Sequence, residues 1–277
     1  MKSLQKKIAC INDISGVGKC SLTVALPIIS ALKCQCCPLT TSVLSSQTGY
    51  PKYTFTDLTD TMQEYIDVWK ELNQQFDTIY SGFLGSIEQI KIVENLINQN
   101  KDSFVIVDPV LADNGSIFPI FDEDDVYEMK KLVGMANLIT PNITEANLLT
   151  GRKTDRFDYS DYELLKLCKE LSNLGPDYVI ITGFEYQDSI YNICYDSKSE
   201  NFSKIGKPFN KVSFSGTGDT FTSIVAAMIT RGFTIDKSVR CATDFIFDAV
   251  DFTVSQGDFD RNDGILFEYF LDRLVRI

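Results

Sequence analysis

The stretch that decides the fold is Ala136-Asn137-Leu138-Ile139-Thr140-Pro141-Asn142-Ile143-Thr144-Glu145. Its first four residues form a short, mostly apolar run that suits a buried strand. Pro141 cannot donate a hydrogen bond to a sheet, so it marks the carboxyl end of that strand. Glu145 then lies near the start of a helix, and the stretch therefore predicts a strand followed at once by a helix.

The same alternation of apolar runs and helical patterns recurs along the chain. Strands are expected over residues 8–11, 38–44, 77–82, 104–107 and 178–181, and helices over residues 22–29, 58–72, 87–97 and 124–133. Strands that alternate with helices favour an α/β fold whose mostly parallel central sheet is covered on both faces. We see no linker and no repeat, so a single domain over residues 1–277 is predicted. Residues 185–213 are expected to contain a hairpin, which serves either as a lid or as a surface feature.

Ligands of such folds lie beyond the carboxyl ends of the strands. The polar residues that stop the predicted strands are therefore expected along one edge of the sheet. These residues are Asp13, Gly82, Asp108, Asn142 and Thr182.

The composition excludes several classes of function. With 26 basic and 38 acidic residues the net charge is −12, which disfavours nucleic acid as a partner. The chain has no histidine, which removes Ser-His-Asp and Cys-His catalysis. No apolar run approaches the roughly 18 residues that a membrane span needs. Cys34 and Cys37 form one C-x-x-C pair without a second pair at zinc spacing, so reduced thiols and a cytoplasmic location are expected.

The strongest chemical signal is Phe214-Ser215-Gly216-Thr217-Gly218-Asp219-Thr220. Two glycines allow the backbone to present its N–H groups, and the following helix directs its positive end at the same point. This arrangement suits the oxygens of a phosphoryl group. Asp219, in the first turn of that helix, can accept a proton from an attacking hydroxyl as a general base. The alternative is an ordinary glycine turn with Asp219 as a helix cap.

Two further segments carry oxygen ligands. Asn142 and Glu145 suit a Mg²⁺–phosphate cluster, because Mg²⁺ needs few carboxylates; alternatively, they form a capping box at a helix start. Asp108, followed by Pro109 and later by Asp113, suits metal and triphosphate binding or a simple turn.

The segment from Gly16 to Ser21 imitates a P-loop but departs from it twice. Asp13 stands where the motif needs its first glycine, and Cys20 stands where a serine or threonine must follow Lys19. We therefore do not predict a P-loop.

With these motifs in place, the chain resembles the ribokinase-like family and, within it, the pyridoxal kinases. The resemblance covers nearly the whole length and rests on six segments in family order. These are residues 45–50, 81–86, 108–110, 140–145, 179–182 and 216–219. It implies a three-layer α/β/α fold of the ribokinase-like type.

The resemblance implies transfer of the γ-phosphate of ATP to the 5′-hydroxymethyl group of pyridoxal, pyridoxine or pyridoxamine. It makes Asp219 the base and assigns the anion hole to Gly216, Thr217 and Gly218. The ATP-binding residues it implies are Asp108, Asn142, Glu145 and Thr182, with Asp108 and Glu145 also serving Mg²⁺. Thr48 and Phe83 would line the pyridine pocket. K⁺ beside Mg²⁺, and a homodimer, are further implications.

The sequence departs from this family around the ring pocket. Pyridoxal kinases usually carry a Ser-His pair after the first strand, whereas this chain has Asn12 and Asp13, and a tyrosine is common where Phe83 stands. Asp13 is an acceptor for an amino group, which fits pyridoxamine or an aminopyrimidine as substrate.

Three alternatives stay open. A hydroxymethylpyrimidine kinase of thiamine synthesis would use the same base with a different ring pocket. A non-catalytic binding protein on this fold would need no base. A sugar or nucleoside kinase of the same superfamily is the third, and such enzymes often carry longer insertions near the N-terminus.

Overall fold

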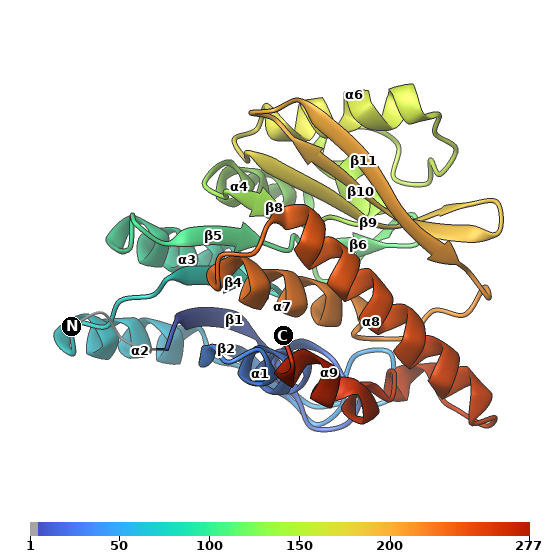
Figure 1. The fold of residues 1–277 in the computed structure, drawn as a ribbon. Helices are drawn as coiled ribbons and strands as arrows, with labels where there is room; N and C mark the ends of the chain where they lie inside the picture. The colour runs from blue at the N-terminus through green and yellow to red at the C-terminus, as the bar shows by residue number, and fades with distance from the viewer. Residues whose placement is uncertain (1–4) are drawn as a thin grey trace. The chain divides into compact units, whose positions relative to one another are not determined.

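The computed structural model describes residues 5–277, and the chain forms two compact units (Figure 1). The first unit combines Met1–Gly82 with Lys211–Ile277, and the second is Phe83–Asn210. The predicted single domain over residues 1–277 stays a prediction, and its residues 1–4 lie outside the described part.

The first unit has four strands in the order β4-β1-β2-β3, where β1 runs parallel to β2 and β4, and β3 pairs antiparallel with β2. The strands are β1 (Lys7–Ser15), β2 (Gln35–Leu44), β3 (Phe55–Asp57) and β4 (Thr78–Ser81). Its helices are α1 (Ser21–Ala31), α2 (Thr59–Glu71), α7 (Thr217–Thr230), α8 (Ile235–Ser255) and α9 (Leu271–Val275), with 3₁₀ turns over Arg261–Asp263 and Phe267–Phe270.

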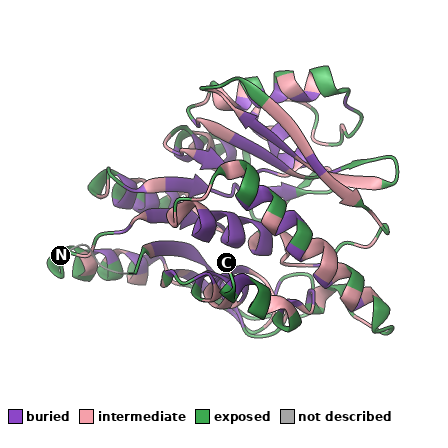
Figure 2. Ribbon diagram, viewed as in Figure 1, coloured by how far each residue is buried: buried purple, intermediate pink, exposed green. Residues whose placement is uncertain are grey.

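The core of this unit surrounds β1. All four residues from Ile8 to Ile11 are fully buried, although successive side chains point to opposite faces of a strand. Helices α1 and α7 contact β1, and α2 contacts β2. Figure 2 shows the resulting buried strand. The strand is thus covered on both faces, as the apolar run predicts.

The second unit has five strands in the order β11-β10-β9-β8-β5. Strands β5 (Phe104–Val107), β8 (Leu138–Ile139) and the start of β9 (Tyr178–Tyr186) run parallel, whereas β10 (Ser189–Asp196) and β11 (Asn201–Pro208) continue the sheet antiparallel. The expected hairpin in residues 185–213 therefore forms two sheet strands. The remaining elements are the small pair β6 (Ala112–Asp113) and β7 (Ser116–Ile117), and helices α3 (Ile87–Gln99), α4 (Glu123–Gly134), α5 (Ile143–Leu149) and α6 (Asp161–Ser172).

Strand β1 continues past the polar residues that were expected to end it. Asn12 and Asp13 both lie inside the strand, and the pairing with β2 shifts register between Asn12 and Ile14. The strand can carry these two buried polar side chains because each has hydrogen-bond partners within the first unit. Within residues 5–277, no helix combines the length and the apolarity that a membrane crossing requires.

Candidate active site

The glycine turn before α7 has a conformation that requires glycine. Gly216 is the N-cap of α7 and has φ 76°, in the left-handed region. A Cβ at this position would lie 1.9 Å from the carbonyl oxygen of Lys19. Packing against Lys19 therefore fixes the turn at the start of α7 and leaves no room for a side chain.

Gly218 is glycine for a different reason. It is exposed, and a Cβ built on it would meet nothing within 4 Å. The protein itself does not require a glycine there, so the empty space suits a ligand that approaches the backbone closely. This space lies at the N-terminal end of α7, where the helix dipole favours an anion.

Asp219 lies in the first turn of α7, beside that space. Its Oδ1 accepts a hydrogen bond from Nδ2 of Asn12 at 3.2 Å, and the backbone N–H of Ser21 also donates to its carboxylate. Burial raises the pKa of Asp219 to about 6, and the negative charge of Asp13 adds to this, while the two donors oppose it. Asp219 is therefore mostly ionised at neutral pH and close to the pKa that suits a general base.

Asp13 is buried and its two carboxylate oxygens accept hydrogen bonds from two hydroxyls. Oδ2 accepts from Oγ of Ser15 at 3.1 Å, and Oδ1 accepts a short bond from Oγ of Ser21. Burial raises the pKa of Asp13, and these two bonds oppose the rise. The oxygens expected to meet a substrate amino group are thus held by the protein.

Ser21 connects the two acids. It has φ 52°, in the left-handed region that an L residue rarely adopts, and it is buried at the start of α1. In this conformation its N–H faces Asp219 while its hydroxyl faces Asp13. Backbone strain of this kind persists only where the surroundings impose it, and it concentrates at functional sites.

The loop that carries Thr48 is tied to the glycine turn. Nε2 of Gln47 donates to Oγ of Ser215 at 3.2 Å and to Oδ1 of Asn262 at 3.0 Å. Oε1 of the same Gln47 side chain accepts from the N–H of Gly49 at 2.7 Å. Thr48 itself is exposed, so its hydroxyl is accessible.

Two residues of the P-loop-like segment have other roles. Nζ of Lys19 donates to the carbonyl of Ile265 at 3.1 Å and pairs with Glu268 at 2.9 Å. Burial, with the nearby charges of Asp219 and Asp13, raises the pKa of Cys20 to about 12. The Cys20 thiol is therefore protonated at neutral pH and is a poor nucleophile.

In the second unit, Glu145 is held by three backbone N–H groups. Oε1 accepts from Leu111 at 3.1 Å and from Ala112 at 3.4 Å, while Oε2 accepts from Asn142 at 2.9 Å. Glu145 is 4% exposed, and burial, followed by the charge of Asp108, raises its pKa well above the ordinary value. Two buried carboxylates that repel each other fit a cation, because a positive charge would relieve both effects.

Asn142 and Thr182 lie next to each other. Asn142 and Glu145 form the capping box of α5, so the structural alternative for this pair is realised. Nδ2 of Asn142 donates to the carbonyl of Ala112 at 2.8 Å. Thr182 forms a parallel bridge with Asn142, and its N–H donates to the carbonyl of Pro141 at 2.9 Å. These contacts bring together the residues expected to bind ATP.

Across residues 5–277 there is no group of three or more acidic or cysteine side chains arranged to hold a metal ion. This does not conflict with Mg²⁺, because Mg²⁺ keeps several waters and uses one or two carboxylates with substrate phosphates. Asp108 and Glu145 are the two carboxylates expected at such a site. All eight cysteines are free thiols.

The expected site residues are divided between the units. The first unit brings together Asp13, Asp219 and the residues from Gly216 to Gly218. The second unit brings together the four residues expected to bind ATP. Phe83, expected in the ring pocket, belongs to the second unit, where its ring lies 6.1 Å from that of Phe121.

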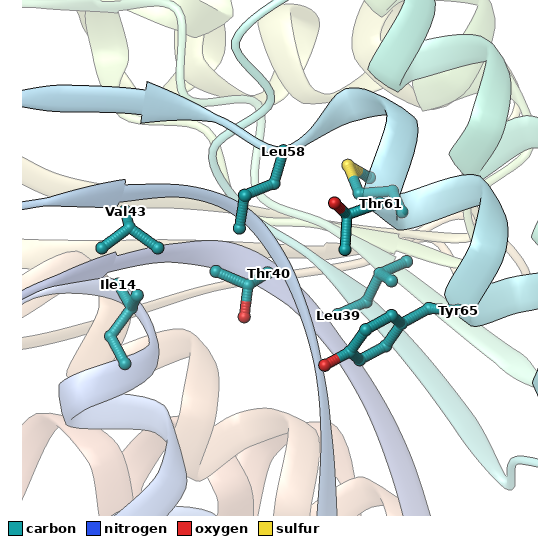
Figure 3. A pocket seen from close by; sticks show the side chains of 8 residues that line it. Ile14, Leu39, Thr40, Val43, Leu58, Thr61 and Tyr65 are labelled. Atoms are coloured by element: carbon teal, nitrogen blue, oxygen red, sulfur yellow. The ribbon is translucent and has the colours of Figure 1, made fainter.

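A small pocket of about 110 Å³ opens between β1, β2 and α2. Figure 3 shows that apolar side chains face it, together with two threonines and Tyr65. The side chains that line it are Ile14, Leu39, Thr40, Val43, Leu58, Thr61, Met62 and Tyr65. Without a charged group this pocket does not suit a phosphate.

Sequence reasoning did not identify Asn12, Ser15, Ser21 or Gln47 as site residues. The sequence carries no signal for Ser21, because serine has no preference for the left-handed conformation that aims its N–H. Gln47 lies directly before Thr48, so its position next to an expected site residue was the one available hint.

Comparisons with known proteins identify a family of kinases. Residues 25–262 match the family described as phosphomethylpyrimidine kinase. A hydroxymethylpyrimidine/phosphomethylpyrimidine kinase of Bacillus subtilis is 28% identical over 201 residues, which cover 72% of each chain. Human pyridoxal kinase is 32% identical over 207 residues, which cover 66% of this chain and 64% of the human one.

A crystal structure from Bacteroides thetaiotaomicron, provisionally assigned as a phosphomethylpyrimidine kinase and crystallised with pyridoxal, is 40% identical. It superposes with a TM-score of 0.93 over 98% of this chain and 96% of its own. The expected ribokinase-like α/β fold is thereby confirmed. The chain belongs to the phosphomethylpyrimidine kinase family, whose relatives here include both hydroxymethylpyrimidine kinases and pyridoxal kinases.

Proposed function

We propose that this protein is a pyridoxal kinase that phosphorylates the 5′-hydroxymethyl group of a B6 vitamer with ATP. The observation that carries the proposal is the position of Asp219, which lies in the first turn of α7 beside the open space at Gly218. A base and an anion-binding helix end at the same point are what phosphoryl transfer to an alcohol requires.

Asp219 removes the proton from the substrate hydroxyl as the oxygen attacks the γ-phosphorus of ATP. One O–P bond forms, the bond from phosphorus to the terminal ADP oxygen breaks, and the proton resides on Asp219. The N–H groups between Gly216 and Gly218 stabilise the charge that gathers on the phosphoryl oxygens. The pKa of Asp219, about 6, leaves it ionised and ready to accept the proton at neutral pH.

The second unit supplies the ATP-binding residues in this proposal. Asn142, just after β8, and Thr182, within β9, offer polar groups side by side. Asp108 and Glu145 hold Mg²⁺, which neutralises phosphate charge when bound. The support for this role is the pair of buried carboxylates, whose mutual repulsion a cation would relieve.

Thr48 and Phe83 are proposed to contact the pyridine ring. Thr48 offers an exposed hydroxyl in a loop that Gln47 ties to Ser215, next to the glycine turn. Phe83 offers an aromatic face already packed against Phe121. Pyridoxal is favoured over a pyrimidine because the relative that is 40% identical over nearly the whole chain was crystallised with pyridoxal.

Hydroxymethylpyrimidine kinase is the second candidate, because the Bacillus subtilis relative carries that activity in its name. The test is a panel of pyridoxal, pyridoxine, pyridoxamine and hydroxymethylpyrimidine with Mg²⁺-ATP, read by ADP release and by mass of the product. We expect the highest kcat/KM for a B6 vitamer. A higher value for hydroxymethylpyrimidine would replace our assignment with the second candidate, and ADP release with none of the four would reject both.

A further inference from the structure

Two hydrogen-bond donors hold Asp219, and both are tied to Asp13. Oδ1 of Asn12 accepts from the N–H of Asp13 at 3.1 Å, which fixes the orientation of the amide so that Nδ2 faces Asp219. The other donor, the N–H of Ser21, is fixed because the Ser21 hydroxyl donates to Asp13. All of these residues lie in the first unit.

The surroundings leave the Asn12 amide little freedom. Asn12 is 1% exposed, and a Cβ on Gly82 would lie 2.4 Å from its Nδ2. Gly82 therefore provides the space that the amide occupies. The packing and the hydrogen bond to Asp13 together determine one position for the donor.

We infer that Asp13 is a positioning residue: its backbone N–H fixes the Asn12 amide and its carboxylate holds the Ser21 hydroxyl, so that both donors are aimed at the Asp219 carboxylate. This inference rests on the proposed function, since it concerns the base of that reaction. It differs from the sequence-based expectation that Asp13 contacts the substrate. Both carboxylate oxygens of Asp13 already accept hydroxyl hydrogen bonds inside the protein.

The pKa of Asp219 depends on the titratable groups that face it. From β1 these are Asp13 and the thiol of Cys10, and from the start of α1 the thiol of Cys20. The pKa values of both thiols are raised, so they remain neutral between pH 5 and 8. Asp13 is the member of this set that contributes negative charge.

The experiment measures kcat/KM against pH for the wild type and for Asp13→Asn and Asn12→Asp. Asp13→Asn removes a negative charge, which lowers the pKa of Asp219, and loosens the Ser21 donor, which raises it, so the expected signature is a fall of about tenfold in kcat above the acidic limb with the KM of the vitamer unchanged. Asn12→Asp replaces a donor with a second carboxylate, so the limb of the pair is expected to move up by about one unit or more. Asn137→Asp makes the same chemical change in the second unit, at a residue outside the hydrogen bonds of Asp219, and should leave the limb in place.

A substrate contact would behave differently. If Asp13 bound the amino group of a vitamer, Asp13→Asn would raise the KM for pyridoxamine selectively and leave kcat unchanged. That outcome would overturn the inference. So would a wild-type kcat in Asp13→Asn together with a wild-type pH profile in Asn12→Asp.

Ser21→Gly keeps the test decisive if Asp13→Asn does not fold. Glycine accepts φ 52° without strain and keeps the N–H, but it removes the hydroxyl that Asp13 holds. We expect kcat to fall about tenfold, with the KM of the vitamer unchanged, because the donor loses its fixed position. An unchanged kcat would contradict the inference. Asp219→Asn, run alongside, separates the two proposals, because turnover near the wild-type rate in that variant would reject the proposed function itself.

Discussion

Asn12 donates to Asp219 at 3.2 Å although 207 positions separate them in the chain. The contact joins the middle of β1 to the first turn of α7 and places an amide donor on the proposed base. It also explains why a polar residue lies in the buried strand β1. The donor stabilises the ionised form of Asp219 and so opposes the rise in its pKa that burial causes.

The first prediction concerns pH. Because Asp219 must be ionised to accept a proton, kcat/KM should fall about tenfold per unit as pH drops below about 6, its pKa. A pH profile of kcat/KM between pH 5 and 8, with ATP and Mg²⁺ saturating, measures this. A profile that stays flat down to pH 5 would mean that burial does not affect the base as the structure indicates.

The second prediction concerns Gly216. Gly216→Ala should destabilise the fold and abolish measurable turnover, because its Cβ would collide with the carbonyl of Lys19. Gly232→Ala is the matched control: Gly232 also has a positive φ, 90°, but open space around it. We expect the control to lose only about 1 kcal/mol, the usual cost of the left-handed conformation, in urea unfolding. Equal losses of unfolding free energy in the two variants would show that the contact with the Lys19 carbonyl does not affect stability.

The third prediction concerns Gly218. Gly218→Ala should fold normally, since its Cβ meets nothing, yet kcat should fall by about 10² because the methyl group would occupy the space proposed for the phosphoryl oxygens. Thermal melting and steady-state kinetics on one preparation test both parts. Full activity in this folded variant would place the anion site elsewhere.

The fourth prediction concerns Glu145 and metal. The pKa of Glu145 is higher in the folded protein than in the unfolded chain, so the unfolded chain releases the proton first. The free energy of unfolding should therefore decline as pH rises above about 4.5 towards the pKa of the folded state. Mg²⁺ with ATP should reverse part of that decline at pH 7. Melting temperatures between pH 5 and 8, with and without Mg²⁺-ATP, measure it.

Glu145→Gln is the informative variant for that prediction, and Glu88→Gln, at an exposed position, is the control. Glu145→Gln should flatten the decline and reduce the gain from Mg²⁺-ATP, whereas Glu88→Gln should do neither. If the stability of Glu145→Gln declines with pH at the wild-type slope, the decline is caused by other titratable groups.

The strand-and-helix order was predictable because the local pattern carries it. Val105, Ile106 and Val107 read as a buried strand, and Pro109 ends it, without reference to any distant residue. The turn at Gly216 was predictable for the same reason, since a glycine at the start of a helix marks the local geometry. The position of Asp219 in the first turn of α7 is as the sequence indicates.

The network around Asp219 could not be predicted, because it depends on contacts between distant segments. Nothing near Ser21 in the sequence indicates a left-handed serine, and nothing indicates that its hydroxyl meets Asp13. Asp13 appeared to be available to a substrate because its hydroxyl partners were unknown. The end of β1 was placed too early for the same reason: polar residues usually stop a strand unless tertiary contacts satisfy them.

Replacing Asp219 with asparagine tests the central claim most directly. Asparagine preserves the size of the side chain but cannot accept the substrate proton, so kcat should fall by about 10³ while ATP affinity, from calorimetry with Mg²⁺, stays within about twofold of the wild type. A folded Asp219→Asn protein that phosphorylates its substrate at nearly the wild-type rate would contradict the claim that this carboxylate is the base.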